Sequence, residues 1–154
     1  MALFVFGAGA TRGASFVSPT KEPCLPPLDR DFFTQLQRIR SQKHHILVRE
    51  VMKDVVDLFG LNFDVTMEVM FTTLEHTIRM LETTGENRDF KKTDLRDKRR
   101  RLVQAVAAAL EESCTEKSGS GGTMHALREC SFHDRFVSEI LQPGDEIVSL
   151  NYDC

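Results

Sequence analysis

Residues 2–15 read ALFVFGAGATRGAS, and the character of the sequence changes at Gly7. The segment before this glycine, Ala2 to Phe6, is continuously apolar, as is usual for a strand that is buried on both faces of a parallel sheet. The segment after it, residues 7–15, is rich in glycine and alanine. An apolar run that ends in a glycine turn is typical of the first strand of an α/β domain. The sequence therefore predicts a strand over residues 2–6.

The glycine turn has the residue types of a phosphate-binding loop. Because glycine has no Cβ, Gly7 and Gly9 would let backbone N–H groups approach a diphosphate closely. Thr11, Arg12 and Ser15 add hydroxyl and guanidinium donors. The spacing departs from the common G-x-G-x-x-G pattern, because Arg12 stands at the third glycine position. A tight turn without a ligand, with Arg12 as an exposed loop charge, is the alternative interpretation.

The apolar residues between positions 29 and 114 follow helical spacing. One helix is predicted from Asp29, and a second after Ser41 that ends at Gly60. The third has the clearest pattern, a single stripe of Met67, Met70, Phe71, Leu74, Ile78 and Leu81. A fourth is expected to begin near Thr93 and to bury Leu102, Val103, Val106 and Leu110. We interpret residues 29–114 as a helical insertion.

The last quarter of the chain predicts a linker, a helix and a second strand. Residues 115–123, TEKSGSGGT, have the composition of a flexible linker. A fifth helix is expected from Ser131, which would form a capping box with Asp134. Its predicted buried face is Phe136, Val137, Ile140 and Leu141. After a Pro-Gly turn, the run EIVSL predicts a second buried strand that leads into Asn-Tyr-Asp.

The order of these elements predicts an α/β fold: part of a Rossmann-like parallel sheet, with a long helical insertion between its first two recognisable strands. Residues 1–154 are expected to form a single domain. Two strands of the buried type do not make a stable parallel sheet alone, because each expects a neighbour on both sides. We therefore expect the domain to be incomplete, and to be completed by further domains of the same protein or by a second copy of the chain.

Two polar residues follow the second predicted strand. Open α/β sheets bind ligands at the carboxyl ends of their strands, which is where Asn151 and Asp153 stand. Alternate residues at a strand end point to the same side, so the amide and the carboxylate could converge on one ligand. The amide can orient a water or a ribose hydroxyl, and the carboxylate can accept hydrogen bonds. The alternative is a polar strand-to-loop transition, since Asn and Asp are common turn residues.

The layout of GAGAT after an N-terminal strand, a helical insertion and then PGDEIVSLNYD resembles the sirtuin-like NAD-binding family. In that family the GAG-x-S or GAG-x-T loop binds the dinucleotide phosphates, and an Asn-x-Asp lies beside the nicotinamide ribose. The resemblance implies that Asn151 is catalytic. It implies that the cofactor is bound by Gly7, Ala8, Gly9, Ala10, Thr11, Arg12 and Asp153.

The same resemblance indicates which activity to expect. The chain has no four-cysteine zinc module of the kind that deacylating sirtuins carry, so no metal is expected. Sirtuin-like domains without zinc are similar to NAD hydrolases, which favours cleavage of the N-glycosidic bond of NAD. The family also uses a histidine base downstream of the Asn-x-Asp, and we assign none of the five histidines to that role. A non-catalytic module that senses a nucleotide or binds a partner is the alternative.

Composition argues against several other classes of protein, namely nucleic-acid-binding, secreted and membrane proteins. With 20 Lys and Arg against 23 Asp and Glu, the net charge of -3 gives no overall attraction to nucleic acid. The basic run at residues 91–101 is better interpreted as a solvated helix face with an Asp94–Lys98 pair. Neither a signal peptide nor an apolar run of membrane-spanning length is present, so we expect a cytoplasmic protein without a membrane partner.

Overall fold

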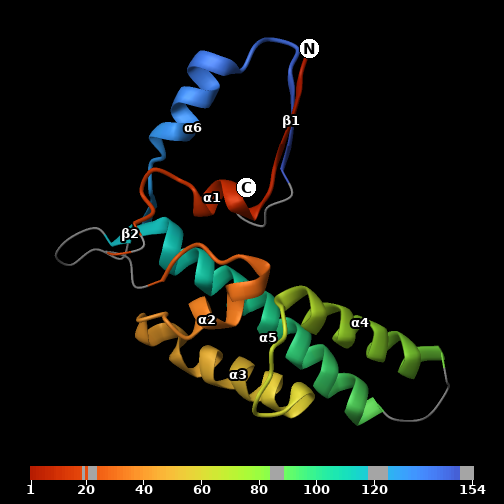
Figure 1. Cartoon of the computed structure of the whole chain (residues 1–154). Helices are drawn as coiled ribbons and strands as arrows, with labels where there is room; N and C mark the ends of the chain where they lie inside the picture. Colours follow the sequence, from red (N-terminus) through yellow and green to blue (C-terminus); the bar gives the residue numbers. More distant parts are fainter. Residues whose placement is uncertain (19, 21–23, 84–88, 118–124, 150–154) are drawn as a thin grey trace.

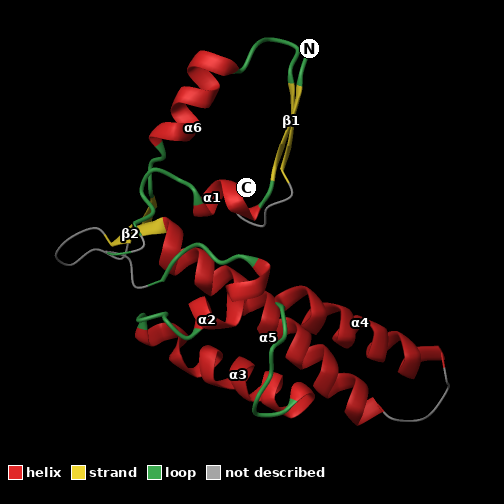
Figure 2. Cartoon of the chain, viewed as in Figure 1, coloured by secondary structure: helices red, strands yellow, loops and turns green. Residues whose placement is uncertain are grey.

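The computed structural model describes residues 1–18, 20, 24–83, 89–117 and 125–149. Most of these residues are helical, and the described strands form two sheets of two strands each (Figure 2). The elements gather in two groups, one of helices α2 to α5 and one around β1, α1 and α6 (Figure 1). This is an α/β fold in the broad sense, in which the predicted helical insertion forms a lobe apart from the parallel strands.

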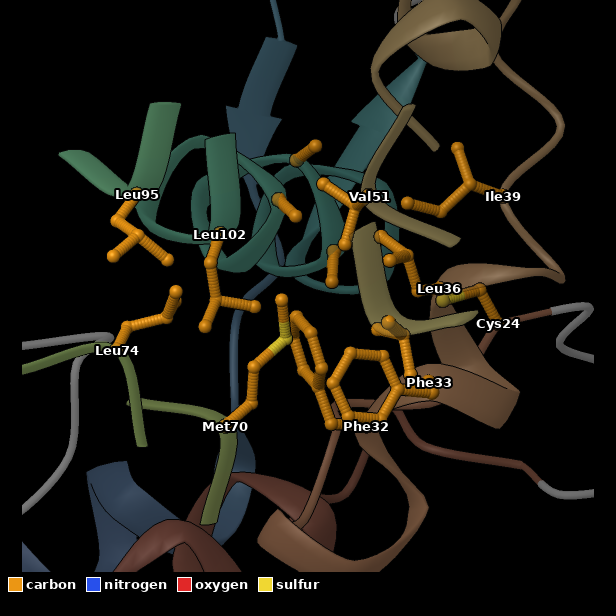
Figure 3. Close-up of a cluster of buried hydrophobic side chains, with 14 of the residues drawn as sticks. Cys24, Phe32, Phe33, Leu36, Ile39, Val51, Met70, Leu74, Leu95 and Leu102 are labelled. Atoms are coloured by element: carbon orange, nitrogen blue, oxygen red, sulfur yellow. The ribbon is translucent and has the colours of Figure 1, made fainter. Parts of the chain in front are cut away.

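The helical lobe is built around its longest helix, α5 (Asp89–Cys114). Helices α2 (Phe32–Leu36), α3 (His45–Phe59) and α4 (Met67–Thr83) all pack against α5. Their apolar side chains meet in a core that includes Phe32, Leu36, Val51, Met70, Leu74 and Leu102 (Figure 3). Short 3-10 turns precede α2 and α3, at Asp29–Asp31 (η1) and Gln42–His44 (η2).

The predicted apolar stripe is confirmed for α4, and the residues predicted to be buried are partly wrong for α5. In α4 the buried residues are Met70, Leu74, Ile78 and Leu81, all members of the predicted stripe. In α5, however, Val103 is 48% exposed, and the buried face consists of Leu95, Leu102, Ala105, Ala108 and Ala109. The helix also begins at Asp89, before the predicted Thr93. The error arises because α5 contacts three helices, so its buried face is wider than one stripe and includes small residues.

A buried group of charges joins α3 to α5. The Asp54 carboxylate is 3% exposed, and it accepts hydrogen bonds from Lys98 Nζ at 3.1 Å and from Arg101 Nε and Nη2 at 2.7 and 2.8 Å. The predicted Asp94–Lys98 pair is also present, at 3.5 Å. The interpretation of residues 91–101 as a solvated face is nevertheless wrong at Lys98, which is only 8% exposed. Unpaired charges are rarely buried, and here the burial is compensated by Asp54.

The two predicted parallel strands lie side by side. Strand β1 (Leu3–Phe6) pairs with β4 (Glu146–Ser149) in parallel, with Phe4 opposite Ile147 and Val5 opposite Val148. The rings of Phe4 and Phe6 pack edge-on against Phe136, with centroids 4.9 and 5.1 Å away. The prediction that both faces are buried is wrong for the described residues, because Leu3 and Val5 on the opposite face are 60% and 57% exposed.

The segment between α5 and β4 also differs from the prediction. The linker expected at residues 115–123 begins as strand β2 (Thr115–Lys117), which pairs with β3 (His125–Leu127) in an antiparallel ladder. The remainder of that linker lies outside the described residues. Helix α6 (Ser131–Arg135) continues as the π-helical turn η3 (Phe136–Ile140). Its expected capping box is absent, since the N-cap residue is Cys130, and its expected buried face is wrong at Val137 and Ile140, which are 59% and 55% exposed.

Gly60, which ends α3, has a conformation that other residues adopt only under strain. Its φ of 86° and ψ of 175° lie in a region that is essentially restricted to glycine. We therefore expect Gly60→Ala to lower the free energy of unfolding by about 1–3 kcal/mol. Gly7→Ala is the matched control, because Gly7 has a φ of -115° and nothing lies within 4 Å of an added Cβ. Chemical denaturation measures both changes, and equal stabilities of the two variants would contradict this assignment.

Candidate functional site

The predicted glycine turn is a short helix that starts directly after β1. Gly7 is the N-cap residue, and Ala8–Arg12 form α1. Neither Gly7 nor Gly9 has a positive φ, and an added Cβ at either position would meet nothing within 4 Å. Backbone conformation and internal packing therefore do not require glycine at these two positions. The open space beside them is what the close approach of a ligand needs.

Arg12, the last residue of α1, is hydrogen-bonded to the segment that precedes the helical lobe. Its two terminal nitrogens donate hydrogen bonds to the Asp31 carboxylate and to the Pro26 carbonyl oxygen. These two contacts anchor α1 to the segment that leads into the helical lobe. The expected role of Arg12 as a phosphate donor stays a prediction.

A cavity of about 460 Å³ lies between β1, α1 and α6, next to the end of α5. Its wall is largely apolar on the side of the strands and of Phe136. The lining residues are Phe6, Ala10, Thr11, Phe16, Cys114, Leu127, Arg128, Cys130, His133, Asp134, Phe136, Val137 and Ile147. Of the residues predicted to bind a cofactor, Ala10 and Thr11 line this cavity. Asn151 and Asp153 lie outside the described residues.

Besides Cys114 at the end of α5, four polar residues of the cavity were missed by sequence reasoning: Arg128, Cys130, His133 and Asp134. The first precedes α6, the second is its N-cap residue, and the other two belong to the helix. The Arg128 backbone N–H donates to the Cys114 carbonyl oxygen at 2.9 Å, which fixes this segment beside the end of α5. The signal that could have revealed the group is the run Cys-Ser-Phe-His at a predicted helix start, which places a thiol and an imidazole one turn apart.

The thiol of Cys130 has an unusual environment. It accepts hydrogen bonds from the backbone N–H and the hydroxyl of Ser15, with the donor atoms 3.4 and 3.7 Å from Sγ. Burial raises the pKa of Cys130, but the donors of Ser15, His133 and Phe132 outweigh it and leave the pKa below its ordinary value. Cys24 is the contrast, since burial in the helical core raises its pKa to about 12.

No arrangement of three or more His, Cys, Asp or Glu residues that could hold a metal ion occurs within residues 1–149 where the structure describes them. No helix in the described ranges is long and apolar enough to cross a membrane. No family model, curated protein or solved structure matches the chain. The site must therefore be interpreted from its own geometry and from the motifs in the sequence.

Proposed function

We propose that the chain is a sirtuin-like NAD-binding domain with a Rossmann-like sheet, and that it takes part in hydrolysis of the N-glycosidic bond of NAD. The observation that carries this proposal is the parallel pairing of β1 with β4. Parallel strands end at the same edge of a sheet, so the carboxyl end of β1, which precedes Gly7, and the carboxyl end of β4, at Ser149, lie together at that edge. In the sequence, Asn151 and Asp153 follow Ser149 closely.

The surroundings of α1 support binding of a dinucleotide. The open space beside Gly7 and Gly9 would admit a diphosphate to the backbone. The neighbouring cavity, lined by Phe6 and Phe136 as well as Thr11, offers an apolar wall to a nicotinamide or adenine ring and a hydroxyl to its ribose. In this proposal the polar part of NAD lies along α1, and one of its rings enters the cavity.

In the proposed reaction a water molecule attacks C1′ of the nicotinamide ribose as the bond from C1′ to the nicotinamide nitrogen breaks. Positive charge develops on the ribose in the transition state. The Asn151 amide orients the water or the ribose, and the Asp153 carboxylate stabilises the charge or holds the carboxamide. Neither residue needs a metal for these roles.

We expect Asn151→Ala to spare NAD binding and to lower the rate of nicotinamide release by about 10²–10³-fold, which is the usual cost of removing one such positioned group. The rate is measured by chromatography of released nicotinamide, and binding by calorimetry, on the full-length protein. Asn62→Ala is the matched control, because Asn62 is an exposed asparagine in the helical lobe and should leave both quantities unchanged. Hydrolysis at the parent rate by Asn151→Ala would refute the catalytic assignment, even if NAD still binds.

A further inference from the structure

The cavity beside α1 holds two thiols, Cys114 at the end of α5 and Cys130 before α6. Six of its thirteen lining residues are large and apolar: Phe6, Phe16, Leu127, Phe136, Val137 and Ile147. The cavity thus combines nucleophilic sulfur with an apolar wall. Cys24, in contrast, is 1% exposed within the helical core and does not line this cavity.

Hydrogen bonds at Cys130 are arranged to favour the thiolate. The Ser15 hydroxyl oxygen accepts a hydrogen bond from the Ser131 backbone N–H at 2.9 Å, so its own hydrogen is available to donate to Cys130 Sγ. The backbone N–H of Ser15 donates to the same sulfur. Two donors from one residue therefore point at a sulfur that lines the cavity, and donors of this kind stabilise the negative charge of a thiolate.

We propose that Cys130 is a nucleophile that forms covalent adducts with compact, apolar α,β-unsaturated carbonyl compounds that enter the cavity. The thiolate sulfur bonds to the β-carbon of the ligand, and the electron pair of the carbon–carbon double bond moves toward the carbonyl oxygen. The resulting enolate takes a proton from water at its α-carbon. The product is a thioether, and the addition requires neither an oxidant nor a leaving group. This proposal does not rest on NAD binding.

Several titratable groups lie around the sulfur, but hydrogen-bond donors determine the direction in which its pKa is shifted. Cys114, Arg128, His133 and Asp134 line the cavity together with Cys130, and Glu129 precedes it in the chain. The hydrogen-bond donors lower the pKa of Cys130 despite its burial, so the thiolate forms at lower pH than in an ordinary cysteine. Removal of the Ser15 hydroxyl should raise the pH midpoint at which the Cys130 thiolate forms.

The test is a timed reaction of the full chain with acrylamide between pH 5 and 10, with each of the four cysteines followed separately by peptide mass spectrometry. At pH 7 we expect Cys130 to react more than about a hundredfold faster than Cys24, because the thiolate fraction of Cys24 is very small. Ser15→Ala should raise the pH midpoint of Cys130, and Ser15→Thr, which keeps a hydroxyl, should restore it. An equal rate at Cys130 and Cys24, or a midpoint unaffected by Ser15→Ala, would overturn the proposal.

A second measurement tests whether the cavity binds the apolar portion of the ligand. N-phenylacrylamide and acrylamide differ by one aromatic ring, so their rate ratio at Cys130 reports whether the cavity receives that ring. The ratio should exceed the ratio measured for free N-acetylcysteine by about tenfold, which is the gain expected from burial of part of a ring. Equal ratios for the protein and the free thiol would show that no apolar ligand is bound, and would overturn the assigned ligand class.

Discussion

Asp54→Ala is expected to lower the free energy of unfolding by about 3–5 kcal/mol, because it removes the buried carboxylate to which both Lys98 and Arg101 are hydrogen-bonded. Lys98 is 8% exposed, so its ammonium would remain largely buried beside the more distant Asp57 and Asp94. Chemical denaturation followed by circular dichroism measures the loss. The matched control is Asp57→Ala: this carboxylate lies 3.7 Å from Lys98 Nζ but is 47% exposed, so its removal should cost less than about 1 kcal/mol.

The same charges predict how stability depends on pH. Burial lowers the pKa of Lys98, but its hydrogen bond and charge interaction with Asp54 outweigh burial and raise it above the ordinary value. A raised pKa in the folded state stabilises the protein fully below the pKa of an unfolded lysine, about 10.4, and this stabilisation disappears as the pH rises through the folded value. The difference in stability between the parent and Asp54→Ala should therefore shrink above this pH. Similar stabilities of Asp54→Ala and Asp57→Ala at neutral pH would contradict the account.

Gly9→Val is expected to abolish NAD binding while leaving the fold intact. Nothing lies within 4 Å of an added Cβ at Gly9, so a side chain that begins there enters open space in the free protein. The same carbons would occupy the space through which a diphosphate must approach the backbone of α1. Thermal unfolding with and without NAD measures both properties: the parent should gain thermal stability from NAD, and Gly9→Val should unfold at the parent temperature without that gain. Gly9→Ala, with a single added carbon, should gain less thermal stability from NAD than the parent and more than Gly9→Val.

The elements that could be predicted from the sequence are those whose patterns are local. The stripe from Met70 to Leu81 repeats at helical spacing, and Gly60 follows the last apolar residue of α3, so both features could be placed without knowledge of their neighbours. The pairing of β1 with β4 connects segments that are 143 residues apart, between Leu3 and Glu146. It was predicted because β1 is continuously apolar, because β4 contains the apolar pair Ile147 and Val148, and because the layout resembles a known family.

Features that depend on distant contacts could not be predicted. Asp54 is an ordinary acidic residue in the sequence of α3, and only the packing of α3 on α5 brings it to Lys98 and Arg101. At the start of α6 the sequence favours Ser131 as the cap, but the helix begins at Ser131 itself and the N-cap position falls to Cys130. Hydrogen bonds between Ser15 and this segment connect residues more than one hundred positions apart, and no local sequence pattern predicts them.

Calorimetric titration of the parent chain and of Gly9→Val with NAD tests the central claim most directly. The proposed function predicts saturable binding of one NAD per chain by the parent and no measurable binding by Gly9→Val, at equal folded fractions. Should the parent show no saturable heat with NAD, or should Gly9→Val bind NAD as tightly as the parent, the assignment of the segment after β1 as a dinucleotide site is contradicted.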